Sequence, residues 1–212
     1  RILNTCHIRE KAAEKIYSEL GRLKKINLNS ERNTKVAVAG CVGKEEGQEI
    51  IKRSPIVDLV FGPLTYHQLP EMLDEIETRP GQPSTKLVNL DMPEEDKFLQ
   101  LKDSRKNLKS ISSLLSIQEG CDKFCSFCVV PYTRGVEISR PAKQILNEAQ
   151  ELIDIGAKEI ILLGQNVNAW SQSNGKDTDM TFAQLINEIS ELSIERIRYI
   201  TSHPRDMTEE LM

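Results

Sequence analysis

The most specific pattern in this chain is Gln118-Glu119-Gly120-Cys121-Asp122-Lys123-Phe124-Cys125-Ser126-Phe127-Cys128. Three cysteines follow one another at Cys-x3-Cys-x2-Cys spacing in one short loop, directly after the strand-like run Ser113-Leu114-Leu115-Ser116-Ile117. Three thiolates at this spacing can hold a 4Fe-4S cluster, which normally takes four. One iron then stays open to a ligand that is not protein. The loop therefore predicts a reactive iron–sulfur site held by Cys121, Cys125 and Cys128.

Zinc binding and disulfide bonding are the alternatives for these cysteines. Structural zinc sites usually have four ligands, often as two Cys or Cys/His pairs. Here the nearest histidine in sequence is His67, and no second Cys-x2-Cys follows the loop. Three cysteines cannot pair evenly, and the chain lacks the signal peptide and the cysteine density of small secreted proteins. The cluster is the favoured interpretation, with zinc as the alternative that stays open.

Composition limits the class of protein. The chain has 212 residues, of which 39% are hydrophobic and 28% are charged, enough for one sizeable core or two small ones. No apolar run is long enough to span a membrane, so we expect no membrane association and a cytoplasmic location. The five cysteines fit a reducing compartment. A net charge of −4 gives no support for broad binding to nucleic acid, so an RNA substrate would need a local basic surface or one outside this chain.

Alternating strands and helices predict a small parallel α/β domain over residues 1–78. The expected strands are residues 36–40 and 57–61, and the expected helices are residues 8–23, 45–52 and 66–76. Residues 79–109 are rich in Pro, Gly, Ser and mixed charges, which predicts an interdomain linker.

The same alternation restarts over residues 110–212. The expected order is strand 113–117, the cysteine loop, helix 141–155, strand 159–163, helix 182–192, strand 196–201 and a helix that begins near Asp206. Three successive βα units predict the first half of a (β/α) barrel, in which reactive groups lie on the loops after the strands. The chain opens on a strand-like run and stops in a helix-like one, so we expect both domains to be incomplete at these ends.

Cys6 and Cys41 form a second pair of candidate ligands. Each follows a strand-like run and precedes a helix, so both are expected at the same edge of a parallel sheet. Two cysteines alone are weak evidence for a metal, because unpaired Cys is among the residues most often buried in protein cores. Metal binding and core packing both stay open on this observation.

Several separated motifs resemble the radical S-adenosylmethionine (SAM) methylthiotransferases. The motifs are Asn4-Thr5-Cys6-His7-Ile8-Arg9-Glu10-Lys11-Ala12, Ala39-Gly40-Cys41-Val42-Gly43-Lys44, Asp58-Leu59-Val60-Phe61-Gly62-Pro63, Cys125-Ser126-Phe127-Cys128-Val129-Val130-Pro131-Tyr132-Thr133-Arg134-Gly135, Leu163-Gly164-Gln165-Asn166-Val167-Asn168-Ala169-Trp170 and Thr201-Ser202-His203-Pro204-Arg205-Asp206-Met207. They span the chain and fall in the family's order. The last two are similar to the branch that adds a methylthio group to C2 of N6-isopentenyladenosine beside the anticodon of tRNA.

The resemblance implies two 4Fe-4S clusters and SAM as cofactors. In that family Cys121, Cys125 and Cys128 would hold the cluster that binds and cleaves SAM, and Cys6 and Cys41 would be two of three ligands of an auxiliary cluster that supplies sulfur. The third auxiliary ligand, the rest of the barrel and an RNA-binding domain would lie outside this chain, which we therefore expect to be inactive alone. The implied partners are a tRNA anticodon stem-loop and an electron donor such as flavodoxin or ferredoxin, and we expect a monomer.

The resemblance, together with their positions in loops of the expected barrel, implies further site residues. Phe127 borders the SAM adenine or, alternatively, is a loop aromatic that closes the core. Gly164, Gln165 and Asn166 are expected to contact the methionine part of SAM, although Gly-Gln-Asn is also an ordinary turn sequence. Thr201, Ser202 and His203 are similar candidates, with His203 alternatively bonding to its own loop. Arg134 and Arg140 would face the RNA phosphate or the SAM carboxylate, or else be solvated surface residues.

Two other functions stay open at this level. A related methylthiotransferase that acts on threonylcarbamoyladenosine in tRNA or on a ribosomal protein would share both clusters. A metal-stabilised RNA-binding module without catalytic activity is the alternative outside the enzymes, although three ligands in the loop and the acidic composition argue against it.

Overall fold

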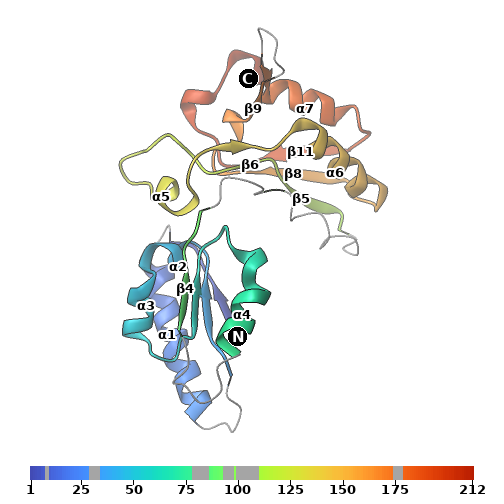
Figure 1. The fold of residues 1–212 in the computed structure, drawn as a ribbon. Helices are drawn as coiled ribbons and strands as arrows, with labels where there is room; N and C mark the ends of the chain where they lie inside the picture. Colours follow the sequence, from blue (N-terminus) through green and yellow to red (C-terminus); the bar gives the residue numbers. More distant parts are fainter. Residues whose placement is uncertain (8–9, 29–33, 78–85, 93–97, 99–109, 174–178) are drawn as a thin grey trace. The chain divides into compact units, whose positions relative to one another are not determined.

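The computed structural model describes residues 1–7, 10–28, 34–77, 86–92, 98, 110–173 and 179–212. It divides into two compact units, each with its own sheet and hydrophobic core (Figure 1). The first unit comprises residues 1–95 and 125–134, and the second comprises residues 96–124 and 135–212.

A parallel four-stranded sheet forms the centre of the first unit, in the order β1-β2-β3-β4. The strands are β1 (Ile2–Asn4), β2 (Ala37–Ala39), β3 (Leu59–Phe61) and β4 (Leu87–Asn89). Every residue of β2 and β3 is buried, as expected for parallel strands that are covered on both faces. The parallel α/β class predicted for this part of the chain is confirmed.

Helices cover both faces of this sheet (Figure 1). Successive strand residues point to opposite faces, so Val38 packs with α1 (Glu10–Leu28) and α3 (Gln48–Arg53). Phe61 instead packs with α4 (Leu69–Glu77). Cys6 and Cys41 follow the carboxyl ends of β1 and β2.

Some predicted boundaries of the first unit are corrected. The single helix expected at residues 45–52 is two helices, α2 (Cys41–Glu46) and α3, which meet at Gly47. The helix expected at residues 66–76 begins as a 3-10 turn, η1 (Tyr66–Gln68), and continues as α4. Helix α5 (Val130–Arg134), which follows the cysteine loop, was not predicted.

Strand β4 lies inside residues 79–109, the segment predicted to be a linker. It pairs in parallel with β3, with Leu87 opposite Leu59. The sheet of the first unit therefore extends beyond residue 78, where the first domain was predicted to end. The equally short β2 and β3 lie in the longer strand-like runs 36–40 and 57–61, whereas β4 has only Leu87 and Val88 as apolar residues, so the sequence did not reveal it. Of the predicted linker, residues 79–109, the structure describes only residues 86–92 and 98.

The second unit contains a parallel sheet in the order β11-β8-β5. Its strands are β5 (Ser112–Ser116), β8 (Glu159–Leu163) and β11 (Arg196–Tyr199). Helices α6 (Ala142–Asp154) and α7 (Phe182–Ser190) pack on one face of it. The residues of this core that come from the sheet and the two helices include Leu115, Ile160, Leu162, Ile145, Ala149, Leu185 and Ile189.

The opposite face of this sheet is open in the described structure, with the Leu114 side chain 51% exposed. Strands that neighbour one another in chain order, with helices on one face, are the arrangement of a (β/α) barrel wall. The predicted order of strands and helices over residues 113–199 is therefore confirmed. The helix expected to begin near Asp206 is wrong: the chain forms two 3-10 turns, η4 (Pro204–Asp206) and η5 (Glu209–Leu211).

Short elements complete the second unit. They are an antiparallel pair β6 (Gln118–Glu119) and β7 (Ile138–Ser139), a second antiparallel pair β9 (Ser171–Gln172) and β10 (Met180–Thr181), and the 3-10 turn η3 (Val167–Ala169). The first pair frames the loop that begins at Gly120. Among the described helices of both units, none has the length and apolar character needed to cross a membrane.

Candidate functional site

The loops that follow β5, β8 and β11 meet at the carboxyl edge of the second unit's sheet. The loop after β5 contacts the loop after β8, because the Gly120 N–H donates to Oε1 of Gln165 at 2.6 Å. It also contacts the loop after β11, because Nζ of Lys123 donates to Oδ1 of Asp206 at 2.8 Å. Three loops far apart in sequence therefore form one polar surface beside the first cysteine.

Cys121 is held by the backbone on both sides. Gly120 before it has φ of +82°, and a Cβ at this position would lie 1.9 Å from the Val136 carbonyl oxygen. The Cys121 N–H donates to the Gly135 carbonyl at 3.2 Å, and its side chain is buried. The sharp turn at Gly120 requires glycine, and it starts the loop in a defined direction.

Cys125 and Cys128 are half-buried and belong to the segment 125–134 of the first unit. The Cys128 N–H donates to the Cys125 carbonyl at 2.9 Å, which closes a tight turn between these two residues. None of the five cysteines forms a disulfide.

The donor chemistry of the loop fits an iron–sulfur cluster. Cys121, Cys125 and Cys128 are three thiols in the reduced form, the ligand type that such clusters use. Within the described residues, however, no three His, Cys, Asp or Glu side chains converge as ligands of one metal ion. The chain therefore supplies the right donors for this group, and the predicted ligand set stays a prediction.

The turn after β8 contains Gly164, Gln165 and Asn166. The Asn166 side chain is 1% exposed, and its two amide atoms are used inside the protein: Oδ1 accepts from the His203 N–H at 3.1 Å and Nδ2 donates to Asp206 at 2.7 Å. Asn166 thus connects the second loop to the third. Its predicted contact with SAM is not tested by this arrangement.

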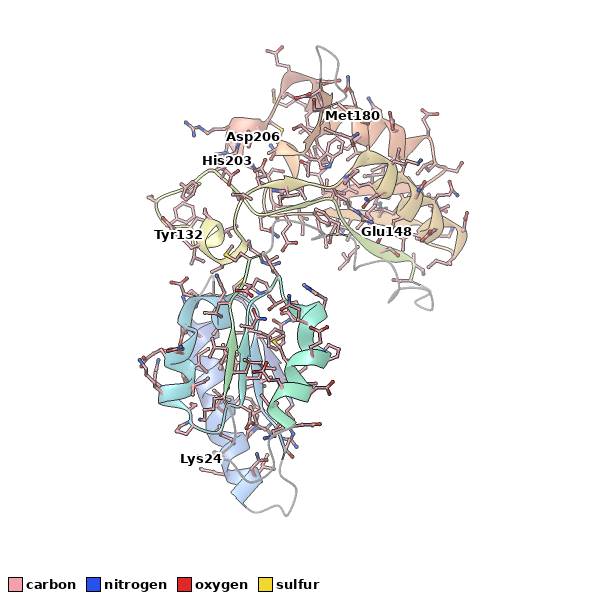
Figure 2. The ribbon with its side chains drawn as sticks, viewed as in Figure 1. Lys24, Tyr132, Glu148, Met180, His203 and Asp206 are labelled. Atoms are coloured by element: carbon pink, nitrogen blue, oxygen red, sulfur yellow. The ribbon has the colours of Figure 1, made fainter. Side chains whose placement is uncertain are left out.

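The loop after β11 carries Thr201, Ser202 and His203. Thr201 has φ of +70°, in the left-handed region, and its carbonyl accepts from the Val167 N–H at 3.0 Å. Nδ1 of His203 accepts from the Arg205 N–H at 3.2 Å, so this imidazole does bond to its own loop, the alternative given by the sequence. Figure 2 shows His203 and Asp206 close together in this loop.

Lys123 and Asp206 shift each other's pKa. Burial acts to raise the pKa of Asp206, but hydrogen bonds from Lys123 and Asn166 outweigh it, and this pKa lies below its ordinary value. The hydrogen bond to Asp206 raises the pKa of Lys123. Both groups are therefore charged over the whole neutral range, and they hold the loops together as an ion pair that is partly shielded from water.

Glu137 lies beside this ion pair. Burial raises the pKa of Glu137; Lys123 lowers it, whereas the neighbouring Asp122 and Asp206 carboxylates raise it further. A hydrogen bond from the Asn166 side chain also lowers this pKa. The Oε2 atom of Glu137 is buried and has no hydrogen-bond partner among the described residues, so one oxygen of the carboxyl group is an unsatisfied acceptor.

Other predicted residues have different surroundings. Phe127 is 90% exposed, so it does not close a core, and of its two interpretations the contact with SAM is the one still open. Arg140 was expected to face the RNA phosphate, the SAM carboxylate or solvent, but its side chain is 2% exposed and its Nη1 lies 2.5 Å from Oε2 of Glu148. Its pairing with this carboxylate on α6 removes Arg140 from the candidate site.

In the first unit, Cys6 and Cys41 follow the carboxyl ends of the neighbouring parallel strands β1 and β2. The expectation that they emerge at the same sheet edge is confirmed. The hydroxyl group of Tyr66 donates to Oδ1 of Asn4 at 2.7 Å, which connects the loop after β3 to the strand that leads to Cys6. Nδ1 of the neighbouring His7 is buried and has no hydrogen-bond partner within the described part of the chain.

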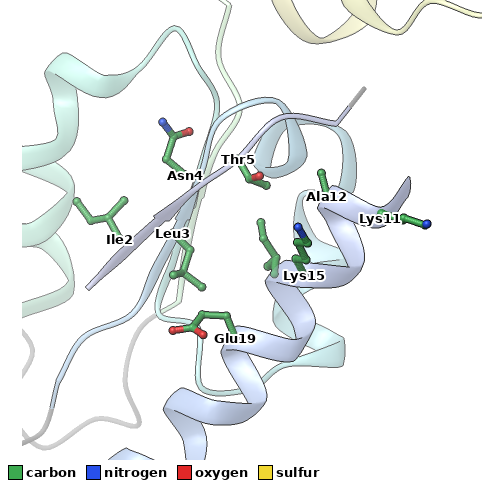
Figure 3. Close-up of a pocket in the computed structure, with 9 residues that line it drawn as sticks. Ile2, Leu3, Asn4, Thr5, Lys11, Ala12, Lys15 and Glu19 are labelled. Carbon is green, nitrogen blue, oxygen red and sulfur yellow. The ribbon is translucent and has the colours of Figure 1, made fainter. Parts of the chain in front are cut away.

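A cavity of about 660 Å³ lies between β1 and α1 (Figure 3). Leu3 points toward α1, where Lys15 and Glu19 line the opposite wall, whereas Ile2 and Asn4 lie on the other side of the strand. The lining reaches Thr5, directly before Cys6, but contains none of the five cysteines. The cavity therefore adds no evidence on the predicted ligand residues.

Known families match both units. Residues 1–62 match the uncharacterized protein family UPF0004, and residues 115–212 match the radical SAM superfamily. Curated relatives match the chain over its whole length: a protein of Ruegeria pomeroyi is 55% identical over 212 residues, one of Ruegeria sp. (strain TM1040) is 54% identical over 213, and one of Agrobacterium fabrum is 49% identical over 218. All three are named tRNA-2-methylthio-N(6)-dimethylallyladenosine synthase.

The chain is thus similar over its whole length to tRNA-2-methylthio-N(6)-dimethylallyladenosine synthases, and its residues 115–212 match the radical SAM superfamily. The resemblance drawn from its motifs is thereby confirmed, and so is the partial (β/α) barrel, which is the fold of the matched radical SAM domain. The chain covers 47% of the length of each of these three relatives, about half.

Sequence reasoning missed the residues that join the loops of the second unit. Gln118, Lys123 and Asp206 were part of the quoted motifs but received no role. Bonds between a side chain and the backbone of a distant loop leave no periodic signal in one sequence. A polar residue inside an otherwise apolar strand end, as at Gln118, is the one cue that was available.

Proposed function

We propose that the protein containing this chain is a tRNA methylthiotransferase that uses radical SAM chemistry on N6-isopentenyladenosine. The observation that carries this proposal is the Cys-x3-Cys-x2-Cys loop directly after β5, with the loops after β8 and β11 bonded to it. In barrel folds the reactive groups lie on these loops. The proposed substrate is taken from the name of the relatives, tRNA-2-methylthio-N(6)-dimethylallyladenosine synthase.

Each group of residues has a role in this proposal. Cys121, Cys125 and Cys128 hold a 4Fe-4S cluster, and Gln165, Asn166 and the residues 201–203 line the SAM site. When bound and reduced, a cluster with one open iron supplies the electron that cleaves SAM. Phe127 borders the SAM adenine.

Cys6 and Cys41 contribute two thiolates to a second, auxiliary 4Fe-4S cluster. Their shared sheet edge in the first unit supports this role, because ligands of parallel α/β domains gather at that edge. The proposed partners are a tRNA anticodon stem-loop and a small electron-transfer protein of the flavodoxin or ferredoxin class. We also propose that the protein acts as a cytoplasmic monomer.

Iron and SAM measurements on the complete protein test the two cluster sites separately. After anaerobic reconstitution, Cys121→Ala is expected to abolish reductive cleavage of SAM. Cys6→Ala is the matched control: it should lower the iron content by about one cluster and leave SAM cleavage in place. Undiminished SAM cleavage in Cys121→Ala, or zinc in place of iron in the wild type, would overturn the assignment.

Nucleoside analysis of tRNA tests the substrate. Deleting the gene is expected to replace 2-methylthio-N6-isopentenyladenosine with N6-isopentenyladenosine in tRNA digests examined by mass spectrometry. A single-stranded loop is where a protein can reach a base edge, which fits an anticodon target. Loss of the methylthio group from threonylcarbamoyladenosine, or no change in any tRNA, would assign the protein to another methylthiotransferase branch.

A further inference from the structure

Gln118 is a buried polar residue to which the function proposed above gives no role. It is the first residue of β6, only three positions before Cys121, and its side chain is 2% exposed. A buried amide must satisfy its donor and its acceptor inside the protein, or the fold loses stability. Its partners therefore show what it does.

All the partners of the Gln118 amide are backbone groups of two loops. Oε1 accepts from the Gln165 N–H at 2.9 Å and from the Asn166 N–H at 3.1 Å, both in the turn after β8. Nε2 donates to the Gly120 carbonyl at 2.6 Å. Gln118 thus connects the residue before Cys121 to the turn predicted to bind SAM.

A reciprocal bond closes this connection. The Gln165 side chain accepts from the Gly120 N–H at 2.6 Å, so each loop bonds to the backbone of the other through a glutamine. The Gln118 amide fits in one orientation, because two N–H donors face one end of it and a carbonyl faces the other. Neither a carboxylate nor a thioether can make all three bonds.

The backbone around Gln118 leaves little room for another arrangement. A Cβ on Gly164 would lie 2.5 Å from Oε1 of Gln118, and a Cβ on Gly120 would lie 1.9 Å from the Val136 carbonyl. The turn after β8 approaches Gln118 closely at Gly164, and the two ends of the cysteine loop approach each other at Gly120. The Gln118 amide therefore has little room to shift toward the turn after β8.

We propose that Gln118 is a positioning residue, which fixes the start of the cysteine loop, and with it Cys121, relative to the turn at residues 164–166. The role of Cys121 as a cluster ligand rests on the function proposed above. The bridging role of Gln118 does not depend on the cluster. Gln118 acts through these two loops and is not itself a catalytic residue.

Three variants of the complete protein separate positioning from stability. Gln118→Met keeps the side-chain length but loses all three bonds, whereas Gln118→Glu keeps an acceptor for the two N–H groups and loses the donor to Gly120. Gln172→Met is the matched control, because Oε1 of Gln172 accepts from the Ala142 N–H at 2.6 Å, away from the cysteine loop. Each variant is compared with the wild type before and after cluster reconstitution.

Amide hydrogen exchange in the metal-free protein measures the bridge directly. In Gln118→Met the amides of Gln165 and Asn166, whose acceptor is removed, are expected to exchange about tenfold faster, the effect of losing one buried hydrogen bond. In Gln118→Glu the exchange of Gln165 and Asn166 should stay near the wild-type rate. Unchanged exchange in Gln118→Met would show that Gln118 does not connect the two loops. Because the protein is metal-free, this test does not depend on cluster binding or on the proposed function.

Electron paramagnetic resonance of the reduced cluster measures positioning. Addition of SAM should change the spectrum of the wild type and of Gln172→Met alike. In Gln118→Met we expect an altered response and an affinity for SAM weaker by about tenfold, at an iron content equal to the wild type. If Gln118→Met and Gln172→Met lose the same thermal stability and both keep the wild-type spectrum and SAM affinity, Gln118 is merely structural and the positioning role is wrong.

Discussion

Gly164 is the residue at which two loops of the candidate site come closest. Because a Cβ there would lie 2.5 Å from the Gln118 amide oxygen and 3.0 Å from its backbone oxygen, one of the loops must move to accept it. Gly164→Ala is expected to lower the free energy of unfolding by about 1–3 kcal/mol, the usual effect of overpacking. Denaturant unfolding measures it.

Gly21 in α1 provides the control, because nothing lies within 4 Å of the Cβ that Gly21→Ala would add. That change is expected to raise the free energy of unfolding by about 0.5–1 kcal/mol, since alanine favours a helix more than glycine does. Equal effects of the two substitutions would contradict the close contact at Gly164.

Glu137 makes stability depend on pH in a defined direction. Burial raises its pKa above the ordinary value of 4.5, so the folded protein favours the protonated form. The stabilisation by this group is complete below pH 4.5 and is lost as the pH rises through the folded-state pKa. Glu137→Gln removes this loss, so at pH 7 the variant should be more stable than the wild type by about 1 kcal/mol or less, given the partial exposure of the site.

Thermal unfolding of the metal-free protein at two pH values checks this expectation. Near pH 4 the two proteins should unfold at nearly the same temperature, because the carboxyl group is then neutral in both the folded and the unfolded wild type. A wild type that is the more stable protein at pH 7 would show that Oε2 of Glu137 has a partner that offsets its burial.

At the scale of elements, the start of α7 is the best-defined helix end in the structure. Thr181 accepts from the Gln184 N–H at 3.2 Å, and the Gln184 side chain accepts from the Thr181 N–H at 2.9 Å, which together form a capping box. Thr181→Ala is expected to lower the free energy of unfolding by about 1 kcal/mol. Thr181→Ser keeps the hydroxyl group, and a serine variant as unstable as the alanine variant would exclude the cap as the cause.

Elements with a long hydrophobic period were predictable, and those held by single contacts were not. The strand at residues 159–163 and the helix that ends near Gly156 follow from apolar periodicity and from Pro141. Strand β4 is three residues long, and its place depends on pairing with β3, which no local pattern records. The break at Gly47 between α2 and α3 was hidden because glycine also occurs inside helices.

The candidate site divides in the same way. The candidate cysteines were predictable because the spacing of the ligands can be read directly from the sequence. Their positions after strands follow from the alternation of strands and helices along the chain. The ion pair of Lys123 with Asp206 joins residues 83 positions apart, so it depends on the arrangement of the loops. The burial of Arg140 against α6 is likewise a result of packing that residue type alone does not indicate.

For the whole molecule, net charge bears on the proposed RNA substrate. This chain has 28 Lys and Arg residues but 32 Asp and Glu residues, so its net charge of −4 gives no overall attraction to the tRNA phosphates. We expect the 212-residue chain to bind tRNA more weakly than the full-length Ruegeria pomeroyi relative, by at least about tenfold at low salt, and with a shallower dependence on salt. Filter binding across a salt series measures both, and equal affinities would show that this chain carries the main RNA surface.

Thr201 shows where fold stability and activity are expected to conflict. A β-branched residue at φ of +70° is strained by roughly 1–3 kcal/mol relative to glycine, which adopts this conformation readily. Thr201→Gly should therefore raise the thermal stability of the protein. The greater conformational freedom of glycine in the unfolded chain acts in the opposite direction and reduces this gain. If the threonine contributes to the SAM site, the same variant should turn over more slowly. Selection for thermostability alone would then favour the less active enzyme, so a directed-evolution experiment on this fold needs an activity screen at position 201.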